Sequence, residues 1–207
     1  MYDPDCPEEN SKRPEKGKSL LELPEDYVVV DLETTGLRPE IDEIIEIGAV
    51  RVRGFEITDT FSTLVYPANG IDPFITQLTG ITAEMLENAP RITEALSQFL
   101  RCVDNDIVVG HNVHFDINFI YDKCIEWFGF GFSNDFIDTK RMSRKLFPEY
   151  RHHRLCDLEE RFGLRNGQAH RALSDVMLTN DCYLYMRNIQ RQKNQMDLRI
   201  RCLDACI

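Results

Sequence analysis

Two carboxylates stand two residues apart inside an apolar segment. Asp31 and Glu33 belong to the run Val-Val-Val-Asp-Leu-Glu-Thr-Thr-Gly. Residues i and i+2 of a β-strand point to the same face, so both acids would share one face of a buried strand. Two desolvated carboxylates repel each other, and a divalent cation between them would remove that cost. By itself the pair is better explained as a strand end facing water, because short motifs match often by chance.

Three residues further along the chain offer related chemistry. Asp116 follows Gly-His-Asn-Val-His-Phe at the predicted start of a helix, where an acid also suits the helix dipole. Asp175 lies one turn into the predicted last helix, and His170 precedes it by five residues. Five residues rotate about 140° on a helix, so His170 can reach the same pocket only from the loop before that helix. Histidine titrates near neutral pH and suits removal of a proton from water.

The intervening sequence predicts the elements that must position these groups. Apolar, β-branched runs predict strands from residue 27, over 44–53 and over 55–66, with the short links of an antiparallel meander. Helices and two short strands then alternate, which predicts a mixed α/β domain. These later elements are helices near 72–78, 82–86 and 92–100, a strand at 106–110, a helix from 115 to 129, a strand at 136–137, a helix after the capping residue Asp138, a helix from 155 to 163 and a last helix from 171 to 188.

These segments resemble the three motifs of the DEDDh, or DnaQ-like, family of 3′–5′ exonucleases. Asp-Leu-Glu-Thr-Thr-Gly is similar to the first motif, His-Asn-Val-His-Phe-Asp to the second and His-Arg-Ala-Leu-Ser-Asp to the third. Similar text also lies between the motifs, as in Leu78-Thr79-Gly80-Ile81-Thr82, so the resemblance covers residues 25–187. It implies a ribonuclease-H-like fold: a mixed five-stranded sheet, an antiparallel meander followed by parallel strands, flanked by helices.

The resemblance also implies a role for each matched residue. The general base would be His170. Two Mg²⁺ or Mn²⁺ ions would be bound by the four acids Asp31, Glu33, Asp116 and Asp175. Substrate contacts would come from Thr34, Leu78, Thr79 and Phe115. The reaction implied is hydrolysis of the terminal phosphodiester, which releases a nucleoside 5′-monophosphate.

Three functions follow from the resemblance. The first is a DNA exonuclease that acts on a single-stranded or frayed 3′ end, either freestanding or as a proofreading subunit like the epsilon subunit of DNA polymerase III. The second is an RNA 3′-end trimming exonuclease of the same fold, because the motifs do not reveal whether a 2′-hydroxyl is required. The third is a non-catalytic nucleic-acid-binding or polymerase-associated module, against which the five intact catalytic positions argue.

Composition limits these alternatives. The net charge of −11 over 207 residues disfavours a protein that coats nucleic acid, whereas bound cations can reverse the sign of an acidic pocket. Seven cysteines without a CxxC pair indicate reduced thiols. The sequence has neither a signal-peptide pattern nor a run of about 20 apolar residues, so we expect a cytoplasmic protein without membrane contact. We expect a flexible tail over 1–24, an exonuclease domain over 25–188 and a C-terminal helical tail over 189–207.

Two surface-like features have competing interpretations. Aromatic residues surround Gly129 and Gly131, where core packing is favoured over base stacking. The stretch from Arg151 to Arg154 is basic, and it suits the substrate backbone as well as it suits a solvated turn.

Overall fold

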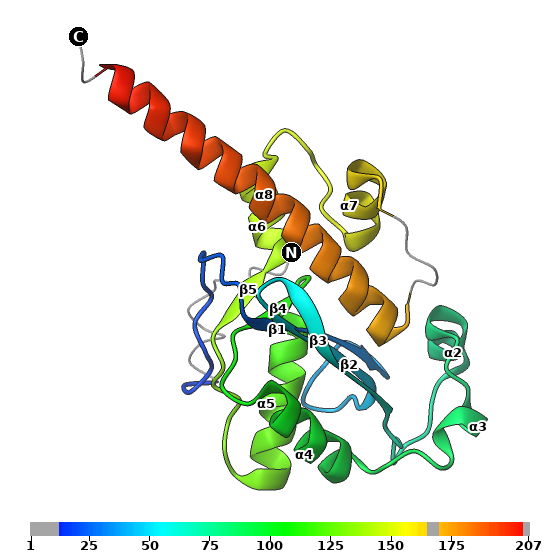
Figure 1. Cartoon of the computed structure of the whole chain (residues 1–207). Helices are drawn as coiled ribbons and strands as arrows, with labels where there is room; N and C mark the ends of the chain where they lie inside the picture. The colour runs from blue at the N-terminus through cyan, green and yellow to red at the C-terminus, as the bar shows by residue number, and fades with distance from the viewer. Residues whose placement is uncertain (1–12, 165–169, 205–207) are drawn as a thin grey trace.

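A five-stranded sheet organises the chain. The computed structural model describes residues 13–164 and 170–204 (Figure 1). The strands are β1 (Tyr27–Thr34), β2 (Ile44–Arg53), β3 (Glu56–Leu64), β4 (Val108–Gly110) and β5 (Phe136–Asp138). The helices are α2 (Pro73–Thr79), α3 (Ala83–Leu86), α4 (Ile92–Val103), α5 (His114–Phe128), α6 (Thr139–Leu146), α7 (Leu155–Phe162) and α8 (Ala172–Asp204).

The strand order of the sheet is β3-β2-β1-β4-β5. β1 pairs antiparallel with β2, and β2 pairs antiparallel with β3. β4 then adds parallel to β1, and β5 adds parallel to β4. The predicted meander followed by parallel strands is therefore confirmed. The third strand is shorter than predicted, because Gly54 and Phe55 both have positive φ and form the turn between β2 and β3.

Helices cover both faces of the sheet, with a large core on each face and a smaller cluster of Ile45, Ile75, Ile81 and Leu86. Val28, Val30 and Leu32 of β1 point to the face covered by α4 and α5. Tyr27 and Val29 point to the opposite face, which is covered by α6, α7 and α8 (Figure 1). Because side chains alternate along a strand, even-numbered residues of β1 belong to the first core and odd-numbered residues to the second.

Residues 13–24 differ from the expected flexible tail, because part of this segment extends the sheet edge. Ser19 forms a parallel bridge with Phe136 of β5, and the Leu20 amide donates to the Phe136 carbonyl at 2.7 Å. Arg13 is buried and donates through Nε to the Asp122 carboxylate of α5 at 2.8 Å. An edge strand has unpaired backbone groups, and this segment satisfies those of Phe136. The first twelve residues lie outside the described part of the chain.

α8 is longer than the predicted last helix, because it continues without a break from Ala172 to Asp204. Of the residues expected to form a separate helical tail, 189–204 are helical but prolong the same helix, and 205–207 lie outside the described residues. Figure 1 shows this C-terminal part extending beyond the sheet. Lys193 still donates to the Leu146 carbonyl of α6 at 3.1 Å. Within residues 13–164 and 170–204, no helix is both long and apolar enough to cross a membrane.

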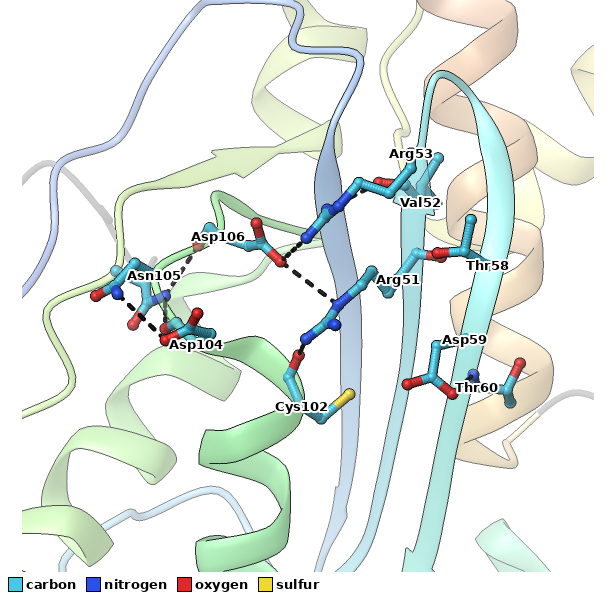
Figure 2. A network of polar contacts seen from close by, with 11 residues as sticks. Arg51, Val52, Arg53, Thr58, Asp59, Thr60, Cys102, Asp104, Asn105 and Asp106 are labelled. Carbon is cyan, nitrogen blue, oxygen red and sulfur yellow. Dashed lines mark hydrogen bonds and ion pairs between the residues drawn. The ribbon is translucent and has the colours of Figure 1, made fainter.

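Arginine side chains gather at the end of β2 that is distant from the acidic pair (Figure 2). Arg53 donates to the Asp106 carboxylate at 2.6 Å, and Arg51 lies 3.6 Å from the same oxygen. Arg51 also donates to the Cys102 carbonyl at the end of α4. Asn134 donates to the Asp106 carbonyl at 2.9 Å. We call these residues the arginine network; it ties β2 to the segments that precede β4 and β5.

Candidate active site

The alternation of β1 determines which helix meets the acidic pair. Asp31 and Glu33 are odd-numbered residues of β1, so they lie on the α8 face. In the antiparallel register, Asp31 stands opposite Gly48 and Glu33 stands opposite Glu46. The register shifts directly after Glu33, which marks the end of regular pairing with β2. The two acids therefore stand where the strand emerges from the core.

α8 brings a third carboxylate to this pair. Asp175 lies in the first turn of α8. Carboxylate oxygens of Asp31, Glu33 and Asp175 all lie within 4.8 Å of one another. Each of these side chains is partly exposed, so the cluster opens to solvent. The structure thus brings together three of the four predicted metal ligands as a group that could hold a metal ion.

Asp116 joins the group from the opposite layer. It lies in the first turn of α5, is only 4% exposed, and accepts a hydrogen bond from the Leu32 amide at 3.1 Å. Leu32 is the residue between Asp31 and Glu33 in β1, so this bond fixes the Asp116 carboxylate beside the pair. Asp116 is also the charged group that most raises the pKa of Asp31.

Crowding keeps these acids from ionising freely. Burial and the nearby carboxylates of Asp116, Glu33 and Asp175 raise the pKa of Asp31 well above its usual range. Burial also raises the pKa of Asp116, although the backbone amides that bond to it oppose the shift. For Glu33, burial and the charges of Asp175 and Glu46 raise the pKa to about 7. Acids held protonated by their neighbours are groups that a bound cation would ionise.

His170 lies in the loop before α8, where the sequence predicted it. Its φ is 60° and its side chain is exposed. Its backbone amide donates to Asp175 Oδ2 at 3.2 Å. The residue is therefore attached to the carboxylate cluster through its backbone, and its imidazole is free to face solvent and substrate. Its role as general base stays a prediction.

The predicted substrate contacts lie in different environments. Leu78 is 45% exposed on α2, whereas the adjacent Thr79 is 3% exposed and donates to the Ile75 carbonyl at 2.9 Å. The Thr34 hydroxyl donates to the Gly36 carbonyl at 2.6 Å, which stabilises the turn after β1. Phe115 packs against Phe119 of α5 with ring centroids 4.9 Å apart. In this arrangement Leu78 is the side chain with most surface to offer a nucleotide.

The turn that presents Asp116 is braced by residues to which the sequence analysis gave no role. His111 Nδ1 lies 3.0 Å from the Thr139 hydroxyl, and its Nε2 lies 2.9 Å from the His153 carbonyl. Ser143 Oγ in turn lies 2.7 Å from His153 Nδ1. Asp138, predicted only as a helix cap, accepts from the amides of Asn112 and Lys140, both at 2.9 Å. The sequence signal that could have identified these residues was the recurrence of histidine in two motif-like segments.

A second unpredicted feature is an ion pair beside the cluster. Glu46 is buried on β2, and the Arg171 guanidinium donates to it at 2.8 Å. Glu46 belongs to the segment that resembles the family between its motifs, but only the antiparallel register shows that it faces Glu33.

In the structure, each of the two features with competing interpretations contains both buried and exposed side chains. Phe132 and Phe136 belong to the core, as favoured, whereas Trp127 and Phe130 are each 50% exposed. Of the basic stretch, His153 is buried, and Arg154 pairs with Asp157 at 2.9 Å in the first turn of α7. Among the described cysteines, the free thiols are Cys102, Cys124, Cys156 and Cys182.

Proteins of known families are similar in sequence to this chain. The family model described as "Exonuclease" (RNase T type) matches residues 28–183. The chain is 44% identical over 158 residues to the DNA polymerase III subunit epsilon of Aquifex aeolicus, covering 76% of this chain and 78% of that protein. It is 39% identical over 169 residues to the PolC-type DNA polymerase III of Bacillus subtilis, covering 80% of this chain. The match spans only 12% of that polymerase.

Solved structures share the fold. A structure of exonuclease X in complex with 5′-overhanging duplex DNA superposes with a TM-score of 0.65 at 24% identity, over 78% of this chain and 91% of that one. Exonuclease I of E. coli in complex with a dA16 oligonucleotide gives 0.68 at 20% identity, over 84% of this chain and 43% of that one. The mixed sheet flanked by helices is thus the ribonuclease-H-like fold. The chain belongs to the exonuclease family, and it is an enzyme of the DnaQ-like 3′–5′ exonuclease class.

Proposed function

We propose that the enzyme removes nucleoside 5′-monophosphates from the 3′ end of DNA, using two divalent cations held by Asp31, Glu33, Asp116 and Asp175. The observation that carries this proposal is the convergence of carboxylates from β1, α5 and α8 at one opening of the core. The epsilon-type relative supports DNA as the substrate class. The role is that of a freestanding exonuclease or of a proofreading subunit that works beside a polymerase.

The residues present fit Mg²⁺ or Mn²⁺. The donor set consists of carboxylate oxygens, which hard cations prefer, and it contains neither thiolate nor imidazole among the described cluster residues. Burial and neighbouring acids raise the pKa values of Asp31 and Asp116, and a bound cation would stabilise their ionised forms. Bound divalent cations would polarise the scissile phosphate and lower the pKa of a water.

The chain's own groups would orient the reaction. Asp116, which accepts from the β1 backbone, and Asp175, in the first turn of α8, would hold the cations against the terminal phosphate. The exposed imidazole of His170 would accept the proton of the attacking water at neutral pH. Leu78 would cover the terminal base, because its side chain is exposed on α2.

The experiment is a nuclease assay on matched oligonucleotides. 5′-labelled single-stranded DNA and RNA of one sequence are incubated with the protein in Mg²⁺, in Mn²⁺ and in chelator. We expect a ladder that shortens from the 3′ end of DNA, abolished by chelator. Faster digestion of RNA would reassign the substrate class. A folded protein that degrades neither would favour a binding module instead.

The role beside a polymerase is tested with a mismatched primer terminus. A proofreading enzyme is expected to remove the frayed, mismatched 3′ nucleotide faster than a paired one. Equal rates on both ends would favour a freestanding enzyme that does not sense pairing.

A further inference from the structure

Glu46 is a buried carboxylate that accepts hydrogen bonds from one segment, the start of α8. It is 2% exposed, and it stands opposite Glu33 in the β1–β2 pairing. Its Oε1 accepts from Arg171 Nη2 at 2.8 Å and Nε at 3.3 Å. Its Oε2 accepts from Arg171 Nε at 3.2 Å and from the Ala172 amide at 3.0 Å. Three N–H donors therefore serve this carboxylate, and the Arg171 Nε–H is shared between its two oxygens.

The donors to Glu46 are the first groups of α8. Ala172 begins the helix, and Arg171 precedes it. The Arg171 carbonyl accepts from the Asp175 amide at 3.0 Å, which closes the first turn. Asp175 in turn accepts from the His170 amide at 3.2 Å. An unbroken chain of contacts therefore connects Glu46 on the sheet to the predicted metal ligand and to the predicted base.

Gly48 supplies an independent observation at the same junction. It is the β2 residue opposite Asp31. A Cβ atom at Gly48 would lie 2.6 Å from the Ala172 carbonyl carbon and 2.8 Å from the Leu173 amide nitrogen. The start of α8 thus rests directly on the strand backbone, closer than any side chain permits. Gly48 and Glu46 both allow the start of α8 to pack closely against the sheet beside β1.

The ion pair also sets the charge of the site. Arg171 and Glu46 carry opposite charges and lie 2.8 Å apart, next to Glu33 in the sheet. The charges of Arg171 and Glu46 cancel within the ion pair. The negative charges of the four predicted ligands then balance two divalent cations. Glu46 without Arg171 would be a fifth buried acid next to the cluster.

We propose that Glu46 and Arg171 are positioning residues of the exonuclease: they dock the first turn of α8 and so place Asp175 and His170 against Asp31 and Glu33. This role rests on the proposed function, because it assumes that the carboxylates bind metal. Glu46 is an anchor in this arrangement, and it does not ligate the cation.

The test combines Glu46→Gln, Arg171→Gln, the conservative Arg171→Lys and the double variant Glu46→Gln/Arg171→Gln. Mn²⁺ binding is measured by electron paramagnetic resonance with thymidine 5′-monophosphate present, alongside kcat and KM on single-stranded DNA. Residues that orient metal ligands typically account for 10- to 100-fold in metal affinity or activity. We expect each Gln variant to weaken Mn²⁺ binding and lower kcat by about that factor, with KM for DNA unchanged.

The double variant and a matched control make the result decisive. Partners in one contact are non-additive, so the double variant should be no worse than the poorer single one, and Arg171→Lys should be intermediate. Arg53→Gln breaks an arginine–carboxylate pair at the far end of β2 and should leave Mn²⁺ binding as in the wild type. Should Glu46→Gln fail to fold, the Arg171 variants decide, because Arg171 is 30% exposed.

Three results would overturn the proposal. Wild-type Mn²⁺ affinity in folded Glu46→Gln and Arg171→Gln would reduce the pair to a structural contact. Additive losses in the double variant would mean that the residues act independently, as they would if Glu46 itself bound the metal. A wild-type chain that binds no Mn²⁺ overturns the metal centre first, and the positioning role with it.

Discussion

The two ends of β2 handle buried charge in opposite ways. At the end near Glu46, carboxylates from β1, α5 and α8 converge, and Arg171 is the cation that meets them. At the other end, Arg51 and Arg53 share Asp106 and neighbouring carbonyl groups. Carboxylates crowd together at one end, whereas at the other end the two arginines lie among Asp59, Asp104 and Asp106 (Figure 2), on the same strand of the same sheet.

This difference distinguishes charged groups that stabilise the fold from charged groups that could bind a cation. In the arginine network, Arg53 donates to Asp106 and Arg51 donates to the Cys102 carbonyl, so both cations have partners within the protein, although among the described residues the buried Arg51 Nε has no hydrogen-bond acceptor. In the carboxylate cluster, burial and neighbouring carboxylates raise the pKa values of Asp31 and Asp116, and a bound cation would offset that cost of ionisation. Shifted titration combined with an opening to solvent is typical of a functional site.

The largest effect is expected from Asp116→Ala. The substitution removes a carboxylate that β1 holds in place through the Leu32 amide. Turnover with Mg²⁺ should fall to near background, because the cations lose a fixed ligand. The fold should survive, since loss of one hydrogen bond of roughly 1 kcal/mol is offset by relief of repulsion around Asp31. Steady-state kinetics and thermal unfolding check both parts.

Near-normal turnover of a folded Asp116→Ala protein would contradict the metal assignment. Asp122→Ala on the same helix is the control, because Asp122 pairs with Arg13 away from the cluster. That variant should keep its activity.

The next effect is expected from His170→Ala. Removing a general base typically lowers a rate by about 10²–10⁴, and His170 is placed at the start of α8 with its side chain exposed. The carboxylate cluster stays intact, so Mn²⁺ binding should not change. Single-turnover rates on a 5′-labelled oligonucleotide measure the loss. A wild-type rate would mean that another group accepts the proton.

Most of the features that depend on the local sequence pattern were predicted from the sequence. The alternation of β1 placed Asp31 and Glu33 on one face, and the loop position of His170 followed from helix geometry. The cap Asp138 was predicted, and it accepts from the Lys140 amide of the helix that follows it. These features depend on neighbours within a few residues, which is why a single sequence reveals them.

Contacts between distant segments were not predictable in the same way. Glu46 and Arg171 are 125 positions apart, and only the register of β1 with β2 shows why they meet. The attachment of residues 13–24 to β5 was missed because a segment rich in charge and proline has no periodicity to indicate what it pairs with. Both cases depend on tertiary packing, which overrides local pattern.

A third prediction concerns stability at acid pH. Burial lowers the pKa of His111 from 6.5 to about 4, although the hydrogen bond to the His153 carbonyl opposes the shift and the charge of Lys140 adds to it. Between those two values the unfolded chain binds a proton that the folded chain does not. Stability should therefore fall as pH decreases from 6.5 to 4, by roughly 3 kcal/mol at most.

Urea unfolding of the wild type and of His111→Gln at pH 7, 5 and 4 isolates this contribution. The carboxylate cluster titrates in both proteins, so the difference between their stability curves belongs to His111. The wild type should lose its advantage over the variant as the pH falls. A constant difference between the two proteins from pH 7 to 4 would show that His111 is not held neutral.

The smallest effect is expected at the arginine end. Asp106→Asn removes the charge that Arg53 and Arg51 share but keeps the shape of the side chain. These side chains are partly exposed, so the loss should be about 1 kcal/mol of unfolding free energy. Activity and Mn²⁺ binding should not change, because Asp106 lies beyond the end of β2 that is remote from the cluster. If Asp106→Asn lowered kcat as strongly as a change at Glu46, the two ends of β2 would be coupled, and the division between structural and functional charge would be wrong.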